Sequence, residues 1–234
     1  MLSAPLPAAD APRPATKPNI VYMLCDDLGY GDVRCLNPER GKIGTPHIDR
    51  LASQGMAFTD AHAGSSVCTP TRYGLLTGRY AWRTRLQQGV LDGGNDEPLI
   101  AADRLTVAGF LGRHGYATAC IGKWHLGFQS DAPVAKRRVG TEPGRGGLPV
   151  GARIIGGPTT RGFELFFGCS NARTMSSLIE NDRVIESIPT IDMLPRLARL
   201  LDQYIADGRS TPGPRQANDV PVAVNRTARK RAKE

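Results

Sequence analysis

The chain has 234 residues, of which 40% are hydrophobic and 22% charged, which is typical of a globular protein with one domain or one and a half. No run approaches the roughly 18 consecutive apolar residues of a transmembrane helix, and residues 1–20 lack the apolar core of a secretory signal. The net charge is +8, but seven basic and two acidic residues between 209 and 234 leave only +3 for the first 208. This uneven charge does not indicate a specific nucleic-acid-binding protein.

The predicted elements alternate between strands and helices. In chain order, the patterns predict a strand at 19–25, a helix from Pro46, a strand at 56–63, a helix from Pro70, a helix from Leu105 to Gly115, a strand at 116–121, a hairpin at 179–188 and a helix at 194–204. Residues 131–158, rich in Gly, Pro and basic residues, predict a surface loop. This order predicts an α/β fold with a largely parallel central sheet flanked by helices.

The strand at 19–25 is a near-continuous apolar run, which predicts burial on both faces. Residues 1–17, rich in Ala and Pro, predict a disordered lead-in. Residues 18–208 are then the folded unit. Residues 209–234 lack apolar periodicity and predict a disordered basic tail.

Two adjacent carboxylates, Asp26 and Asp27, follow the first predicted strand. Ligand sites in open α/β sheets lie outside the carboxyl ends of the strands. Paired carboxylates at such a place suit a hard cation such as Ca²⁺ or Mg²⁺. The alternative interpretation is a solvated turn before Gly29.

Cys68 differs in position from the other four cysteines of the chain. The five form no C-x2-C pair, so they indicate neither a structural zinc site nor a disulfide framework. A helix from Pro70 would place Cys68 at its N-terminus, where the helix dipole favours an anion, with Arg72 one turn on. Gly74 occupies the position where a Cys-x5-Arg phosphatase loop needs arginine, so that class is excluded.

Lys123 and His125 follow another predicted strand. Lysine supplies a fixed positive charge, and histidine exchanges protons near neutral pH. Taken singly, each residue is more often structural or solvated. Parallel strands would nevertheless bring these residues to the same edge as Asp26 and Asp27.

Together the motifs resemble the N-terminal part of the sulfatase family, of the arylsulfatase type within the alkaline phosphatase superfamily. The matching stretches are DDLGYGD from Asp26, TPHIDRLA from Thr45, CTPTR from Cys68, LTGR from Leu76 and GYATACIGKWH from Gly115. The resemblance covers about residues 18–208. It implies an alkaline-phosphatase-like fold and the hydrolysis of aryl or carbohydrate sulfate esters.

The resemblance also implies a role for each site residue. A separate formylglycine-generating enzyme would oxidise Cys68 to formylglycine, whose hydrated aldehyde attacks the sulfur of the ester. Asp26, Asp27 and the modified Cys68 would ligate Ca²⁺, or Mg²⁺ in its place. Arg72 would hold the formylglycine, Lys123 would bind the sulfate, and His125 would assist proton loss.

Members of this family are typically much longer, and their further residues complete the metal site and supply a leaving-group acid. The sequence after Gly208 therefore predicts a truncation, or a reading-frame change near residues 210–213, and a poor catalyst by itself. Two alternatives stay open: an inactive fragment, and a hydrolase of phosphate or phosphonate esters on the same scaffold. The compartment stays open as well, because the family is often exported while this chain shows no signal.

Overall fold

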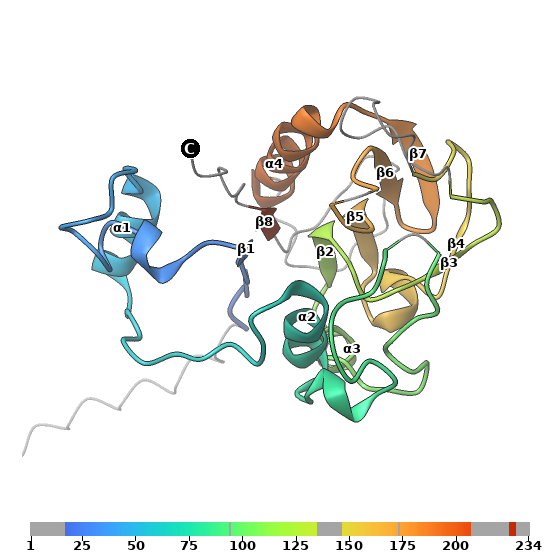
Figure 1. Ribbon diagram of the computed structural model, residues 1–234, viewed down its shortest axis with the longest axis horizontal. Coiled ribbons are helices and arrows are strands. Elements are labelled where there is room, and N and C mark those ends of the chain that lie inside the picture. The colour runs from blue at the N-terminus through green and yellow to red at the C-terminus, as the bar shows by residue number, and fades with distance from the viewer. Residues whose placement is uncertain (1–16, 94, 135–146, 173, 207–224, 228–234) are drawn as a thin grey trace, which may run out of the picture.

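The computed structural model describes residues 17–93, 95–134, 147–172, 174–206 and 225–227, which form an α/β fold (Figure 1). The strands are β1 (Leu24–Asp26), β2 (Ala119–Lys123), β3 (Gln129–Ser130), β4 (Ile154–Ile155), β5 (Leu165–Cys169), β6 (Ser177–Glu180), β7 (Arg183–Ser187) and β8 (Asn225–Thr227). The helices are α1 (Pro46–Gln54), α2 (Cys68–Thr77), α3 (Val107–Arg113) and α4 (Thr190–Ala206). Short 3₁₀ turns occur at Tyr30–Asp32, Ala81–Arg83 and Pro158–Arg161.

The main sheet has four strands in the order β2-β5-β6-β7. β2 and β5 are parallel, whereas β6 pairs antiparallel with β5 and with β7. A second parallel pair, β1 with β8, lies beside β2 (Figure 1). The predicted α/β class with helices flanking a sheet is confirmed. The sheet itself is mixed, with its parallel pairs together on the side of β1 and β2.

The core lies on both faces of this sheet. Phe166 and Phe167 of β5 are neighbours in sequence, so they point to opposite faces, and both are buried. Phe166 joins a cluster with Tyr73 of α2 and Ala108 of α3, while Phe167 packs in a cluster with Met193 of α4. The sheet is therefore covered by α2 and α3 on one face and by α4 on the other.

Most predicted elements are present. The four helices and the hairpin of β6 and β7 confirm the sequence patterns. The strand expected at 116–121 lies at Ala119–Lys123, so it runs directly up to the candidate site. Within the region expected to be a surface loop, Ala152 and Ile154 are buried, because β4 pairs with β3.

Two strand predictions are wrong in whole or in part. Residues 56–63 form no strand, and Met56 and Phe58 are exposed, because their alternating pattern meets no partner strand. In the run at 19–25, only Leu24 and Cys25 belong to a strand, and the apolar side chains at 20–23 are exposed. Apolar character alone did not bury either segment.

The predicted disordered ends fall almost entirely outside the described residues. Of the lead-in, only Lys17 is described, and of the tail only β8. Among the residues that are described, no helix is long and apolar enough to cross a membrane.

Candidate functional site

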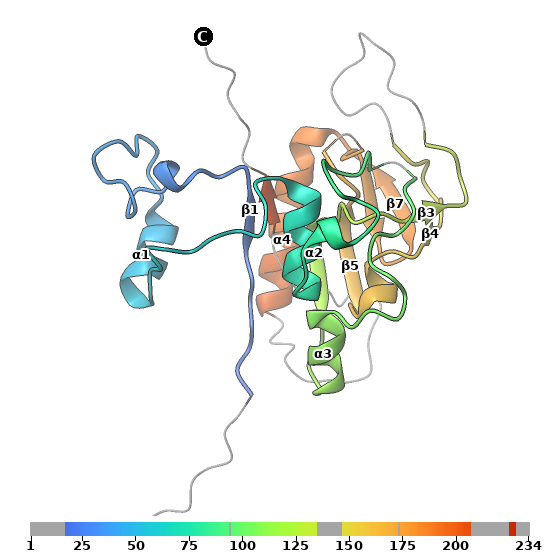
Figure 2. The same cartoon turned by 60° about the horizontal axis from the view of Figure 1, so that its bottom comes forward.

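Asp26, Arg72 and Lys123 form a buried ion-pair cluster where β1, α2 and β2 meet. The Asp26 Oδ2 atom accepts a hydrogen bond from Lys123 Nζ at 2.6 Å and another from Arg72 Nη2 at 3.1 Å. Arg72 Nη1 also donates to the Lys123 backbone oxygen at 2.5 Å. Figure 2 shows β1 beside α2, as these contacts require. Three segments far apart in sequence are therefore tied together through one carboxylate.

Local backbone geometry brings Lys123 to this point. Gly122 of β2 is opposite Gly168 of β5, and a Cβ atom at Gly168 would lie 1.9 Å from the Gly122 oxygen. The two strands therefore approach closely just before Lys123, which only glycine permits. On α2, the helical period places Arg72 one turn after Cys68 on the same face.

The cluster carries more positive than negative charge. Burial by itself would raise the pKa of the Asp26 carboxyl, but the hydrogen bond and charge of Lys123, together with the charge of Arg72, hold this pKa below its ordinary value of 3.8. Asp26 is therefore ionised at neutral pH and balances only one of its two cationic partners. The remaining positive charge is buried, which favours binding of an anion.

His125 lies next to this cluster as a neutral imidazole. Its pKa is lowered to about 4, chiefly by burial; the charges of Lys123 and Arg72 act in the same direction, whereas the Leu91 hydrogen bond and the Asp26 charge oppose them. Nε2 lies 2.7 Å from the Leu91 carbonyl oxygen, which can only accept, so Nε2 carries the proton. Nδ1 is then an unprotonated acceptor, and it is buried without a hydrogen-bond partner among the described residues.

The backbone at His125 is strained. Its φ of 53° lies in the left-handed region, which a residue with a Cβ adopts at a cost of about 1–3 kcal/mol. The neighbouring chain holds it there, since its N–H donates to Ser170 O at 2.8 Å and its carbonyl accepts from Thr69 Oγ1 at 3.0 Å. Such strain typically persists where the surrounding structure fixes a functional group.

Cys68 is the first residue of α2 and is half-buried. Val67 at the N-cap position provides no side-chain cap, so the positive end of the helix dipole is not offset there. Burial raises the pKa of the Cys120 and Cys169 thiols to about 12, which makes those two inert. Cys68 differs from them because it opens the helix that carries Arg72 of the charged cluster.

Asp27 follows Asp26 but is exposed, with a left-handed φ of 60°. Both ion pairs of Asp26 use Oδ2, so its Oδ1 takes part in neither. Within the part of the chain that the structure describes, no three His, Cys, Asp or Glu side chains gather into a group that could hold a metal. The two carboxylates have the hard oxygen donors that Ca²⁺ prefers, but they supply fewer than its usual 6–8 ligands.

Sequence reasoning missed the residues that hold His125. The Leu91 carbonyl accepts from its ring, and the loop after Leu91 is held by Ser170 and Asn171, which donate to Gly93 O at 2.7 Å and Asp92 O at 2.6 Å. In all three contacts a side chain meets a backbone carbonyl. A carbonyl is present at every residue, so the sequence does not mark which carbonyl each side chain will reach.

Comparison with known proteins decides which family this arrangement belongs to. The family model for sulfatases matches residues 18–211. The chain belongs to the sulfatase family. Among curated relatives, an N-acetylgalactosamine-6-O-sulfatase of Bacteroides thetaiotaomicron is 51% identical over 111 residues, which are 47% of this chain and 21% of that protein. Human arylsulfatase A is 44% identical over 113 residues, 48% of this chain and 22% of the relative.

Solved structures give the same fold for this sulfatase chain. A Bacteroides thetaiotaomicron structure, whose title concerns the metabolism of multiple glycosaminoglycans, has a TM-score of 0.59 and 39% identity over 73% of this chain and 32% of its own. A Pseudoalteromonas sulfatase has a TM-score of 0.60 at 22% identity, covering 91% of this chain and 44% of its own. The matched region thus spans about a fifth of the curated relatives and less than half of these structures.

Proposed function

We propose that this protein acts in the hydrolysis of sulfate esters, at a site built around Cys68. One observation carries the proposal: a buried cluster with excess positive charge adjoins the start of the helix that Cys68 opens. A sulfate monoester is an anion, and both the cluster and the helix dipole favour negative charge. The relative at 51% identity is named for a sulfated amino sugar, which favours a carbohydrate sulfate as the substrate.

We further propose that Cys68 is converted to formylglycine by a separate maturation enzyme and that Asp26 and Asp27, with residue 68, hold Ca²⁺. Formylglycine would supply a hydroxyl nucleophile, and Ca²⁺ would polarise the sulfate oxygens. The hard oxygen donors fit this ion in type, and the ligands beyond them would come from water or from groups outside the described residues.

The chain's own residues then have separate tasks. Lys123 and Arg72 attract the sulfate group and fix its orientation against residue 68. Asp26 orients both cations, since its Oδ2 accepts a hydrogen bond from each. His125 offers the unprotonated Nδ1 as an acceptor for a proton released near residue 68, while the Leu91 carbonyl keeps the other ring nitrogen protonated.

The modification is tested by producing the chain together with a maturation enzyme and labelling it with an aldehyde-reactive hydroxylamine probe. Trypsin should release residues 51–72 as one peptide, because no Lys or Arg lies between Arg50 and Arg72. The label should appear on this peptide and vanish in Cys68→Ala, while Cys35→Ala keeps it. The proposed modification would be contradicted if this peptide stayed unlabelled while a control sulfatase, produced with the same maturation enzyme, was fully labelled.

Anion recognition is tested without any turnover. Inorganic sulfate should bind to the Cys68→Ala chain in a calorimetric titration, and Lys123→Met should weaken that binding by about tenfold or more, since a charge-assisted hydrogen bond is lost. Release of sulfate from a sulfated sugar by the aldehyde-bearing chain then tests the reaction itself. Faster release from a phosphate or phosphonate ester would favour the alternative chemistry of the same scaffold.

A further inference from the structure

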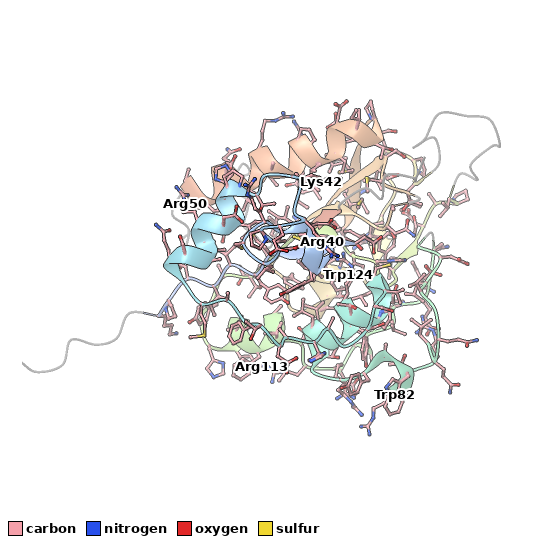
Figure 3. All side chains as sticks on the ribbon, turned by 60° about the vertical axis from the view of Figure 1, so that its left-hand side comes forward. Arg40, Lys42, Arg50, Trp82, Arg113 and Trp124 are labelled. Atoms are coloured by element: carbon pink, nitrogen blue, oxygen red, sulfur yellow. The ribbon has the colours of Figure 1, made fainter. Side chains whose placement is uncertain are left out.

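An exposed group of aromatic and arginine side chains follows the far end of α2. We call it the aromatic–arginine patch, and it consists of Arg79, Tyr80, Trp82, Arg83 and Arg85. Tyr80 and Trp82 are 56% and 57% exposed, and their rings are nearly parallel, at 15° with centroids 6.0 Å apart. Figure 3 shows Trp82 at the edge of the molecule and the second tryptophan, Trp124, inside it.

The exposure of these rings is built into the backbone. The 3₁₀ turn Ala81–Arg83 buries Ala81 in the core, so the residues on either side of it point outward. Thr84 closes the turn, because its N–H and its Oγ1 both donate to the Ala81 carbonyl, at 2.9 and 2.6 Å. The two rings therefore lie together on the surface, where they form an aromatic platform. By contrast, Trp124 is buried and donates its indole N–H to Gly127 O.

The platform is surrounded by positive charge. The Arg83 guanidinium lies 5.3 Å from the centroid of the Trp82 ring, a cation–π contact that holds it at the platform. Arg85 is fixed by hydrogen bonds to the Pro98 and Glu97 carbonyls. Between residues 61 and 91 the sequence has four arginines and no acidic residue. Among the described residues, none of the patch arginines forms an ion pair.

We propose that the aromatic–arginine patch is a surface binding site for a sulfated polysaccharide. The C–H groups of a sugar ring pack on the electron-rich face of an aromatic ring, and guanidinium groups bind sulfate through paired N–H donors. The patch offers both kinds of group side by side. This inference rests on the proposed function, which makes sulfate esters the chemistry of the chain.

The distance between the patch and Cys68 indicates a polymeric ligand. Cys68 begins α2 and the patch follows its end, and ten helical residues span about 15 Å. A single sulfated sugar cannot occupy both places, whereas a chain of sugars can be held at the patch while one of its esters reaches the site. The patch then raises the local concentration of substrate without touching the reacting atoms.

The test measures binding by affinity electrophoresis in gels that contain dextran sulfate or unsulfated dextran. The protein carries Cys68→Ala throughout, so binding is separated from hydrolysis. Dextran sulfate should retard this chain and dextran should not. Combining Trp82→Ala with Arg83→Ala should weaken the retardation by about tenfold, since one stacking surface and one cation are lost. Trp82→Phe, which keeps a ring, should retain most of it.

The matched control combines Tyr30→Ala with Arg50→Ala, which also removes one exposed ring and one exposed arginine (Figure 3 labels Arg50). This control should change retardation less than about twofold. The proposal would be overturned if dextran sulfate retarded the Trp82→Ala, Arg83→Ala variant as strongly as the chain with an intact patch. It would also be overturned if unsulfated dextran retarded the intact chain as strongly as dextran sulfate does. Tighter binding of a single-stranded DNA oligomer than of dextran sulfate would reassign the patch to nucleic acid. Absence of sulfate release by the aldehyde-bearing chain, with dextran sulfate binding retained, would contradict only the proposed function.

Discussion

Residues 17–66 and residues 68–206 contain similar apolar patterns but differ in what covers them. In the second region Phe166 is 0% exposed, at the centre of a cluster between the sheet and α2. In the first region Phe58 is 71% exposed, and Figures 1 and 2 show α1 standing away from the sheet. Hydrophobic sequence therefore predicts where burial is favourable, whereas burial itself requires a partner surface.

The border between the two regions is an apolar groove. It has a volume of about 520 Å³ and is lined by Ile20 and Tyr22 before β1, Leu75 of α2 and Leu111 of α3. The side chains at 20–22 would be expected to lie in a sheet, and in this structure they line the groove instead. The candidate site lies at the same border, because Asp26 comes from the first region and Arg72 and Lys123 from the second.

The largest expected effect compares one phenylalanine from each region. Phe166→Ala should lower the free energy of unfolding by about 3–5 kcal/mol, since it leaves a cavity in a packed core. Phe58→Ala should change it by less than about 0.5 kcal/mol, because the side chain is exposed. Urea unfolding followed by circular dichroism measures both. A cost above about 2 kcal/mol for Phe58→Ala would show that the first region packs against something in solution.

A second comparison uses the adjacent carboxylates. Asp26→Asn removes the carboxylate that pairs with buried Arg72 and Lys123, so it should cost about 3 kcal/mol of unfolding free energy. Asp27→Asn should cost less than about 0.5 kcal/mol, because Asp27 is exposed and asparagine tolerates its left-handed backbone. The same urea titrations provide the measurement. Equal costs for the two variants would show that the ion pairs do not hold the two regions together.

The third prediction concerns pH. His125 has a folded pKa of about 4 against 6.5 in the unfolded chain, so between these values the unfolded chain binds a proton that the folded chain does not. Stability should therefore be complete above about pH 6.5 and fall toward pH 4, by at most about 3 kcal/mol. Asp26 contributes to the loss of stability only at lower pH, because the pKa of its carboxyl in the folded chain is held below the ordinary value of 3.8.

Unfolding free energies measured at half-unit steps from pH 4 to 7 test this dependence. His125→Gln should flatten the curve between pH 4 and 6.5, whereas His47→Gln, at an exposed position, should leave it unchanged. A curve that keeps its slope in His125→Gln would mean that other groups produce the acid sensitivity.

The sequence predicted the elements better than it predicted burial. Helical periodicity located α1, α2, α3 and α4, since a helix face is a local property. Sequence motifs indicated Cys68, Arg72 and Lys123 as candidate site residues, because each has a chemically distinctive side chain. Two things were not predictable: the antiparallel pairing of the predicted hairpin with β5, which makes the sheet mixed, and the carbonyl contacts around His125. Both depend on which segments meet in space, and no short pattern records that.

The smallest expected effect concerns α1, which its sequence periodicity predicts and whose apolar face is exposed. Leu51 lies on that face with more than half of its surface exposed. Leu51→Gln exchanges an exposed apolar side chain for a polar one of similar helix propensity, so the unfolding free energy should change by less than about 0.5 kcal/mol. Leu197→Gln on α4 is the matched control and should cost several times more, because Leu197 is buried in the cluster with Phe167. A cost above about 1.5 kcal/mol for Leu51→Gln would mean that another surface covers α1 in solution. The two regions would then not differ in burial as the structure indicates.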